Sequence, residues 1–366
     1  MIKPIEVYDD ELAAETTAEE IQTFLERHFL SSRWLTFRLE VNCIHAFYIL
    51  ATRSFTNKST FPSLRSLELT FTGYFSLDPD DTCLDENLHS SHLVFSEPQT
   101  QLRFLQIRGL FSPHIFGTSF HQHLTDLVHL ELNFSGEYEW YDHKKNTPAA
   151  RLIDMDPTSS EVVKALNVPK VHMPMLKTFL CLAISSPVWV LDHLLTLDAP
   201  NITTFGLTFG KEPLKRISGG SKAIRQLVSY IITSGPIGAT RKTNPLFPSL
   251  ANLTFSSPEG CFQENVEMLL VGYPEITSLA LPKCSALQAL VDLAPELVNL
   301  KVGVKDVTGL KDLLVKRLEA GIPLKRVQVI RSALGNPIES GALKELEDLV
   351  DFSLVDEEEF SKDDNH

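Results

Sequence analysis

The sequence predicts an α/β solenoid in which each repeat adds one strand to a common parallel sheet. Along its 366 residues a short motif recurs: an apolar residue, two variable residues, an apolar residue, one variable residue and a third apolar residue. Helix-like segments follow several copies, at 266–270 and 310–321 for example. The motif and its spacing together favour irregular leucine-rich repeats, which form a horseshoe with a parallel sheet on its concave face.

We assign eleven copies of the motif. Their apolar residues are Trp34-Phe37-Leu39, Leu64-Leu67-Leu69, Leu102-Leu105-Ile107, Leu127-Leu130-Leu132, Leu176-Phe179-Cys181, Ile202-Phe205-Leu207, Leu250-Leu253-Phe255, Ile276-Leu279-Leu281, Leu297-Leu300-Val302, Leu324-Val327-Val329 and Leu349-Phe352-Leu354. Six of the ten intervals between first positions are 21 to 27 residues, as in leucine-rich repeats. The intervals of 49 and 48 residues either hide a degenerate repeat or carry an insertion.

The spacing within the motif has a direct structural meaning. The last two apolar residues are two positions apart, so both face the same side of a strand. The first belongs to the turn that enters the strand. Proline precedes several copies, as in FPSL at 61–64 and 247–250, where it ends a helix and restarts an extended segment. The alternative is an ordinary doubly wound sheet, but motif and spacing recur together, which favours the solenoid.

The chain divides into three parts. Residues 1–20 form an acidic N-terminal segment, and residues 21–355 form the solenoid. A helix that carries Ile21, Phe24, Leu25 and Phe29 caps its first repeat. Residues 356–366, DEEEFSKDDNH, form an acidic tail that we expect to be disordered.

Composition limits the possible partners and the compartment. The formal net charge of −14 argues against nucleic-acid binding, which requires a basic surface. No apolar stretch approaches the length of a membrane span, and the N-terminus lacks the apolar core of a signal peptide. The five scattered cysteines favour reduced thiols. These features predict a cytoplasmic or nuclear protein that binds neither nucleic acid nor membrane.

Three segments between the motifs have distinctive compositions. Residues 72–101 carry six acids and no Lys or Arg, residues 136–170 begin with three aromatic residues, and residues 211–245 hold seven bases against one acid. The basic segment is either a patch for an acidic partner or a helix whose buried face includes Ile224 and Leu227, with solvated bases opposite. We favour the helix.

The sequence offers no catalytic centre, metal site or cofactor site. Five histidines and Cys83 crowd residues 83–123, but their spacing does not match a zinc site, and we take them as surface residues. Residues 218–222, SGGSK, lack the full phosphate-loop pattern. An enzyme with a pocket under segment 136–170 is the least favoured alternative, because no catalytic motif supports it. We therefore predict a protein that is not an enzyme and needs no cofactor.

The sequence resembles the leucine-rich-repeat region of the F-box-like proteins that are expanded in mushroom-forming fungi. The resemblance is carried by FLERHFLSSRWLTFRLEV at 24–41, by FPSLRSLEL and FPSLANLTF, and by RLEAGIPLKRVQV at 317–329. It implies a substrate receptor of a cullin ubiquitin ligase, whose adaptor binds an F-box N-terminal to the repeats. Only about 20 residues precede the capping helix here, too few for an F-box, so adaptor binding is expected only if an F-box exists upstream.

The predicted function is a non-catalytic protein-interaction scaffold that recognises a protein ligand on its concave face. The alternative is an orphan repeat protein without a link to a ligase. Outward positions in the early repeats are aromatic, charged or apolar, whereas the middle repeats present small polar residues such as Thr204 and Thr254. The candidate protein-binding residues are Arg38, Glu68, Phe104, Arg108, His129, Glu131, Leu180 and Leu182.

Overall fold

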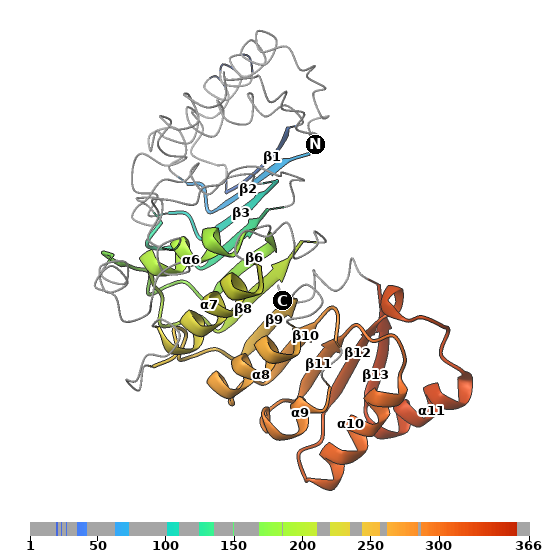
Figure 1. The fold of residues 1–366 in the computed structure, drawn as a ribbon. Helices are drawn as coiled ribbons and strands as arrows, with labels where there is room; N and C mark the ends of the chain where they lie inside the picture. Colours follow the sequence, from blue (N-terminus) through green and yellow to red (C-terminus); the bar gives the residue numbers. More distant parts are fainter. Residues whose placement is uncertain are drawn as a thin grey trace.

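The computed structural model places eleven strands in one parallel sheet (Figure 1). It describes residues 20, 23, 27, 35–41, 63–72, 101–109, 124–134, 149, 168–184, 186–210, 220–234, 244–256, 262–284 and 287–356. In spatial order the strands are β1 (Thr36–Val41), β2 (Ser66–Phe71), β3 (Phe104–Arg108), β4 (His129–Asn133), β6 (Thr178–Ile184), β8 (Thr204–Phe209), β9 (Asn252–Ser256), β10 (Ser278–Leu281), β11 (Asn299–Val302), β12 (Arg326–Ile330) and β13 (Asp351–Val355). Two short strands, β5 (Val171–His172) and β7 (Leu197–Asp198), pair beside the main sheet.

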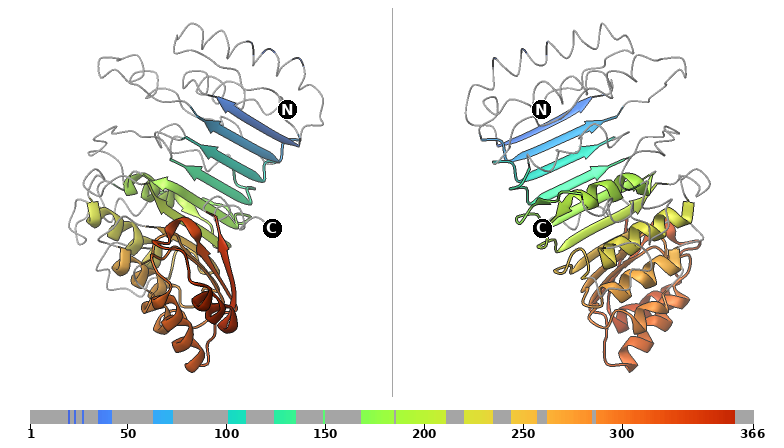
Figure 2. Two further views of the ribbon diagram at one scale, coloured as in Figure 1. Left: turned by 90° about the vertical axis from the view of Figure 1, so that its right-hand side faces the viewer. Right: turned by 60° about the vertical axis from the view of Figure 1, so that its left-hand side comes forward.

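The described helices lie on one face of the sheet (Figure 2). They are α6 (Pro187–Thr196), α7 (Gly220–Thr233), α8 (Phe262–Gly272), α9 (Ala289–Asp292), α10 (Thr308–Glu319) and α11 (Ser340–Leu349), with a 3₁₀ turn at Arg331–Ala333. The stack bends, with strands on its inner side and helices on its outer side (Figure 1). We call the strand face opposite the helices the open face. The α/β prediction and the parallel sheet are confirmed, and the arrangement is consistent with a solenoid.

The register of the sheet follows the sequence motif. The second apolar residue of each copy pairs with that of the next along one row, which runs from Phe37 on β1 to Phe352 on β13. Residues of this row, such as Leu67, Leu130 and Leu279, are at most 1% exposed. All eleven predicted strands are therefore present in the predicted register, although Trp34 of the first copy lies outside the described residues.

The intervals of 49 and 48 residues between motif copies add no strand to the main sheet, so both carry insertions. β4 pairs directly with β6, and β8 pairs directly with β9, so no strand of the sheet lies between them. Part of the first insertion forms β5, which pairs outside the main sheet with β7. The alternative of a hidden strand in these intervals is thereby resolved.

A recurrent hydrogen-bond pattern joins successive repeats at the start of their strands. The carbonyl of Leu35 accepts the N–H groups of both Arg65 and Ser66, at 2.8 and 3.0 Å. The same two-donor arrangement recurs at the following junctions as far as Val298, whose carbonyl accepts from Lys325 and Arg326. Each repeat thus satisfies the backbone donors of its successor, which buried backbone requires.

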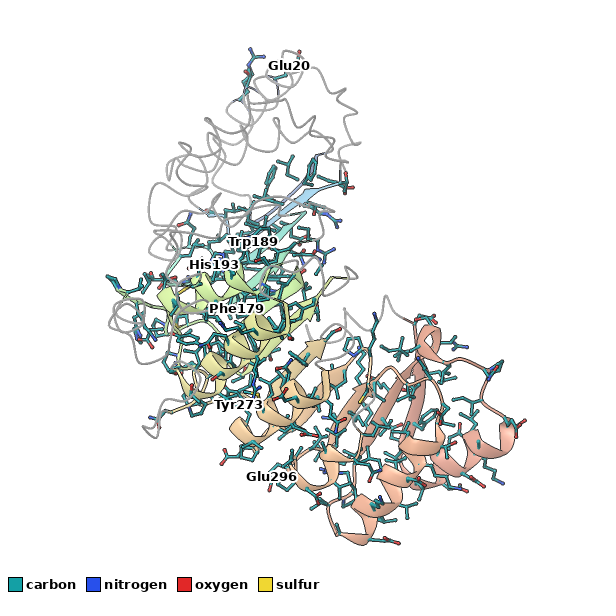
Figure 3. All side chains as sticks on the ribbon, in the orientation of Figure 1. Glu20, Phe179, Trp189, His193, Tyr273 and Glu296 are labelled. Atoms are coloured by element: carbon teal, nitrogen blue, oxygen red, sulfur yellow. The ribbon has the colours of Figure 1, made fainter. Side chains whose placement is uncertain are left out.

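The core fills the layer between the sheet and the helices (Figure 3). Aromatic rings link its layers: Phe179 lies 6.0 Å from Phe205, which lies 5.0 Å from Phe247. From the helix side, Trp189 of α6 packs on Phe134 at 5.8 Å. The Tyr273 hydroxyl donates to the Ile231 carbonyl at 2.7 Å, so its polar end is satisfied within the core.

Arg317 of α10 is a charged residue inside this layer, with 0% exposure. Its guanidinium donates to backbone carbonyls of the segment that contains α9 and the turn before β11. The acceptors are Leu290 (2.5 Å), Ala294 (2.9 Å), Leu297 (2.9 Å) and Pro295 (3.4 Å). The guanidinium therefore fastens one repeat to the next through four backbone carbonyls.

The helices at 266–270 and 310–321 are confirmed as parts of α8 and α10, although α10 ends at Glu319. In the basic segment, α7 buries Ile224 and Leu227 while Lys222 and Arg225 are exposed, as the helical interpretation predicts. Arg225 pairs with Glu264 of α8 at 2.9 Å. The other predictions for segments 1–20, 72–101, 136–170 and 356–366, and for the apolar stripe of the capping helix, lie largely or wholly outside the described residues.

Candidate protein-binding surface

The eight predicted residues all lie on the open face, on consecutive strands of the sheet. Alternation along each strand places them in three rows opposite the buried rows. One row contains Phe104 and His129, which are register partners; the next contains Arg38, Glu68, Glu131 and Leu180; the third contains Arg108 and Leu182. The structure therefore brings together residues that are up to 144 positions apart in the sequence, from Arg38 to Leu182.

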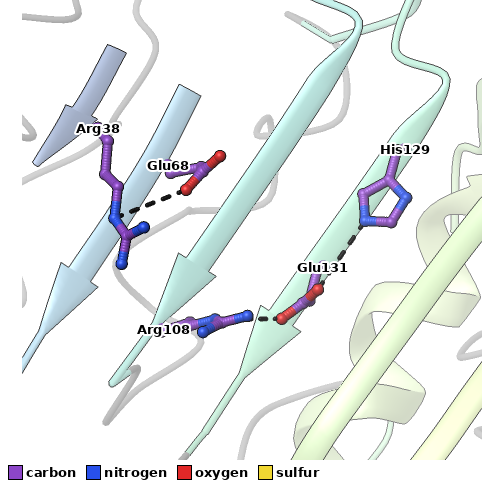
Figure 4. Close-up of polar contacts among 5 residues, drawn as sticks. All are labelled: Arg38, Glu68, Arg108, His129 and Glu131. Atoms are coloured by element: carbon purple, nitrogen blue, oxygen red, sulfur yellow. Dashed lines mark hydrogen bonds and ion pairs between the residues drawn. The ribbon is translucent and has the colours of Figure 1, made fainter. Parts of the chain in front are cut away.

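Two ion pairs cross between strands on this face (Figure 4). Arg38 Nε lies 3.8 Å from Glu68 Oε2, and Arg108 Nε lies 3.4 Å from Glu131 Oε1. They differ in solvent exposure, since the Arg38 side chain is 64% exposed whereas the Glu131 side chain is 6% exposed. The first pair is therefore strongly screened by solvent, and the second fixes its arginine more firmly.

Phe104 stacks on its register partner His129. The two ring centroids are 4.4 Å apart, and the planes are 13° from parallel. Phe104 is half-buried, whereas His129 is only 7% exposed. His129 Nε2 also lies 3.9 Å from Glu131 Oε2, beyond hydrogen-bond distance but close enough for an ion pair when the imidazole is protonated. The ring of Phe104 is thus held by a shielded neighbour.

Glu131 is the buried centre of this network. Its carboxylate is shielded by the surrounding side chains, with the residue only 4% exposed. Burial alone would raise the pKa of Glu131, but His129, Gln106 and Arg108 together hold that pKa below its usual value. Glu131 therefore stays ionised near neutral pH and holds the Arg108 side chain, which is 46% exposed.

Leu180 and Leu182 extend this surface onto β6, where both are half-buried. Leu180 lies over Gly206 of β8: a Cβ on that glycine would lie 2.7 Å from Leu180 Cδ2. Just beyond, β6 contains a bulge between Cys181 and Ile184, with Ala183 at φ 52°. The Ala183 N–H donates to Thr208 Oγ1 at 3.1 Å, which compensates for the irregular backbone.

Some residues of this surface support their neighbours, and the sequence alone did not indicate that role. Gln106 lies between Glu68 and Glu131 in the same row, yet it was not among the candidates. His129 and Glu131 were expected to present themselves to a ligand, but the structure shields both from solvent. The register did carry a signal for Gln106, because every second residue of a strand faces the same side.

The described residues give no support for a metal-binding or phosphate-binding site. Among them, no three His, Cys, Asp or Glu side chains gather so as to hold a metal ion. The predicted surface histidines at 89–123 and Cys83 lie outside the described residues, as do Ser218 and Gly219 of the SGGSK segment. Within the described part, each helix is too short or too polar to span a bilayer.

Comparison with known proteins adds no family assignment. No protein-family model matches the sequence, and a search of curated proteins finds no match.

Proposed function

We propose that the chain is a non-catalytic protein-interaction scaffold, a leucine-rich-repeat solenoid that binds a protein ligand on the open face of β1, β2, β3, β4 and β6. The observation that carries the proposal is the group of pre-positioned large side chains on that face. Phe104 is stacked on His129, and Arg108 is held by Glu131. Aromatic residues and Arg dominate the binding energy of protein interfaces.

Shielding of the supporting residues favours binding energetically. A side chain that is already held loses less conformational entropy when a ligand docks. In this proposal Phe104 and Arg108 contact the ligand, whereas His129 and Glu131 hold them in place. Leu180 and Leu182 add an apolar border, and Arg38 with Glu68 form a solvated edge.

The repeat type and the link to a ubiquitin ligase are part of the same proposal. Strand and helix repeats with a parallel sheet that the described helices leave open on one face suit the recognition of proteins. Together with the resemblance to F-box-like proteins, this supports a role as a substrate receptor. That role requires an F-box, so the coding sequence upstream of Met1 tests it directly: an F-box there supports the ligase role, and its absence removes it.

Site-specific photocrosslinking tests the binding surface. A benzophenone amino acid is placed at position 104 in one protein and at position 254 in a matched control, and each is exposed to extract from the source organism. We expect a protein that crosslinks from position 104 and not from position 254. Crosslinking from position 254 alone would contradict the assignment of the surface.

A further inference from the structure

Arg108 is held on the open face by one end of its guanidinium group. Its Nε atom lies 3.4 Å from Glu131 Oε1, and no hydrogen bond of Nη1 or Nη2 is found among the residues that the structure describes (Figure 4). The side chain is 46% exposed. The two terminal nitrogens of a guanidinium lie in one plane and bind a carboxylate through two parallel hydrogen bonds. Arg108 therefore offers a fixed, unused site for an anion.

Arg326 of β12 provides a comparison on the same face. Its Nε also meets a carboxylate, Asp351 Oδ2 at 3.1 Å, but these two side chains are 61% and 65% exposed. The Glu131 side chain, in contrast, is 6% exposed. Because solvent screens an exposed pair more strongly, Arg108 is the more firmly held of the two arginines. A ligand that binds Arg108 consequently loses less conformational entropy in ordering it.

The acids of the described residues on β1, β2, β3 and β4 do not compete for Nη1 and Nη2. Glu68 lies 3.8 Å from Arg38, and Glu131 contacts Arg108 through Nε. Exposed Glu40 lies on β1, two strands from Arg108, a separation of about 10 Å. An acidic ligand therefore meets an arginine whose neighbouring carboxylates are already paired or distant.

An apolar side chain lies in the same row as Arg108. Asn133 of β4 is the register partner of Arg108 on one side and of Leu182 on the other. Leu182 is half-buried, and it lies two strands from Arg108, about 10 Å away along the row. The Arg108 side chain reaches Glu131 on β4, so its guanidinium lies closer to Leu182 than the backbone of β3 does.

The backbone next to Leu182 is irregular. A β-bulge follows it, with Ala183 at φ 52°, a conformation that alanine rarely adopts. The chain then returns Ile184 to the core, where it is 1% exposed. Bulges and strained residues are frequent at binding sites, where they redirect side chains. The irregular backbone therefore coincides with the apolar end of the row, which is a second observation that points to this part of the open face.

We infer that the protein ligand binds through an acidic residue with an apolar residue two positions away. Its carboxylate accepts hydrogen bonds from Nη1 and Nη2 of Arg108, and its apolar side chain packs on Leu182. Residues two apart in an extended segment face the same side and lie about 7 Å apart, which fits the one to two strand spacings, about 5–10 Å, between the guanidinium and Leu182. This inference rests on the proposed function, because it names the chemistry of the ligand that the proposed surface recognises.

Peptide selection tests this chemistry in the full-length chain. A displayed library of short random peptides is selected on the native chain, on Arg108→Gln and on the matched control Arg326→Gln. Peptides from the native chain and the control should be enriched in Asp or Glu two positions from a large apolar residue. Peptides selected on Arg108→Gln should lose the acidic preference and keep the apolar one.

Affinities of one enriched peptide, synthesised with its acid and with the corresponding amide, measure the contact by fluorescence anisotropy. Arg108→Gln and the amide peptide should each weaken binding about tenfold, and their combination should weaken it no further. Arg326→Gln should change Kd by less than about twofold. Arg108→Lys keeps a charge beside Glu131 but lacks the planar pair of nitrogens, so it should also lose affinity. Far-UV circular dichroism verifies that each variant is folded.

Phe104→Ala separates a failure of the inference from a failure of the proposed function, because Phe104 belongs to the proposed surface whatever the charge of the ligand. Two results would overturn the inference alone: peptides that depend on Phe104 but carry no acid, or equal affinity of the native chain, Arg108→Gln and Arg108→Lys for an acidic peptide that depends on Phe104. Peptides that are indifferent to Phe104→Ala and to Arg108→Gln, or a selection that enriches no peptide, would contradict the proposed function and the inference together.

Discussion

The open face of β2–β4 differs sharply from that of β8–β10, although the buried face beneath is alike. On β2–β4 it carries large side chains that contact one another: Phe104 stacks on His129, and Arg108 pairs with Glu131. The outward row that holds Glu68, Gln106 and Glu131 on β2–β4 continues on β8–β10 as Gly206, Thr254 and Ala280. Beneath both stretches the second apolar residues of the motif are at most 2% exposed. Burial therefore constrains the inward rows everywhere, whereas the outward rows are free to differ between regions.

The largest expected effect on stability comes from placing a charge at a buried strand position that faces the helices. Leu279 is 1% exposed, and Leu279→Asp would bury a carboxylate without a partner. We expect a loss of about 4 kcal/mol or more in the free energy of unfolding, measured by urea titration. Ser278→Asp, on the neighbouring outward position, is the control and should cost less than about 1 kcal/mol. Equal losses would show that the assignment of the two faces is wrong.

Arg317 tests the one buried guanidinium described above. Arg317→Met removes the guanidinium that donates to the carbonyls of Leu290, Ala294 and Leu297, so we expect a loss of about 3 kcal/mol in thermal or urea unfolding. Lys316→Met removes a neighbouring exposed base and should cost less than about 0.5 kcal/mol. A stable Arg317→Met protein would show that the guanidinium does not fasten the two repeats.

Glu131 should make stability depend on pH in a defined direction. Because its folded pKa lies below the usual value, its contribution is present above the unfolded pKa of about 4.3 and is lost as the pH falls through the lowered folded pKa. Glu131→Gln should therefore cost about 1–2 kcal/mol at pH 7, and its difference from the native protein should shrink in acid.

Urea titrations of both proteins between pH 7 and pH 3 measure this difference. Exposed Glu296→Gln is the control, and it should track the native protein across the range (Figure 3). If the difference in the free energy of unfolding between Glu131→Gln and the native protein is as large at pH 3 as at pH 7, the loss comes from the shape of the amide and not from loss of the charge.

The smallest expected effect is at the exposed pair Arg38 and Glu68. Their atoms are 3.8 Å apart, and the arginine side chain is 64% exposed, so solvent screens the attraction. A double-mutant cycle with alanine should give a coupling energy of about 0.5 kcal/mol or less. The same cycle on Arg108 and Glu131 should give a larger value. The reverse order would contradict the distinction between the solvated edge and the supported centre.

Most of the fold could be predicted from the sequence because the buried apolar positions of the strands recur in a fixed pattern. Pairs of apolar residues two positions apart identified all eleven strands, and the paired rows give their register. The periodicity of residues 310–321 predicted α10 because its apolar face repeats every three to four positions. These features are local patterns of burial, so a single sequence expresses them directly.

The remaining features depend on contacts between repeats. Arg317 stands beside Lys316 in an amphipathic helix, so its pattern matches a solvated base, whereas the structure buries it. The bulge at Ala183 has no local signal, because alanine does not favour a positive φ. On the candidate surface, alternation predicted which residues face outward, but the shielding of His129 and Glu131 arises from side chains on neighbouring strands.

The most direct test of the proposed function is the affinity of the purified partner for two double variants, measured by isothermal titration calorimetry. Phe104→Ala with Arg108→Ala should weaken binding by about 2 kcal/mol or more, which is roughly 30-fold in Kd. Thr254→Ala with Ser278→Ala, on the open face of β9 and β10, should change Kd by less than about threefold. Unchanged affinity of the folded first variant, with binding abolished in the second, would contradict the assignment of the ligand to β1, β2, β3, β4 and β6.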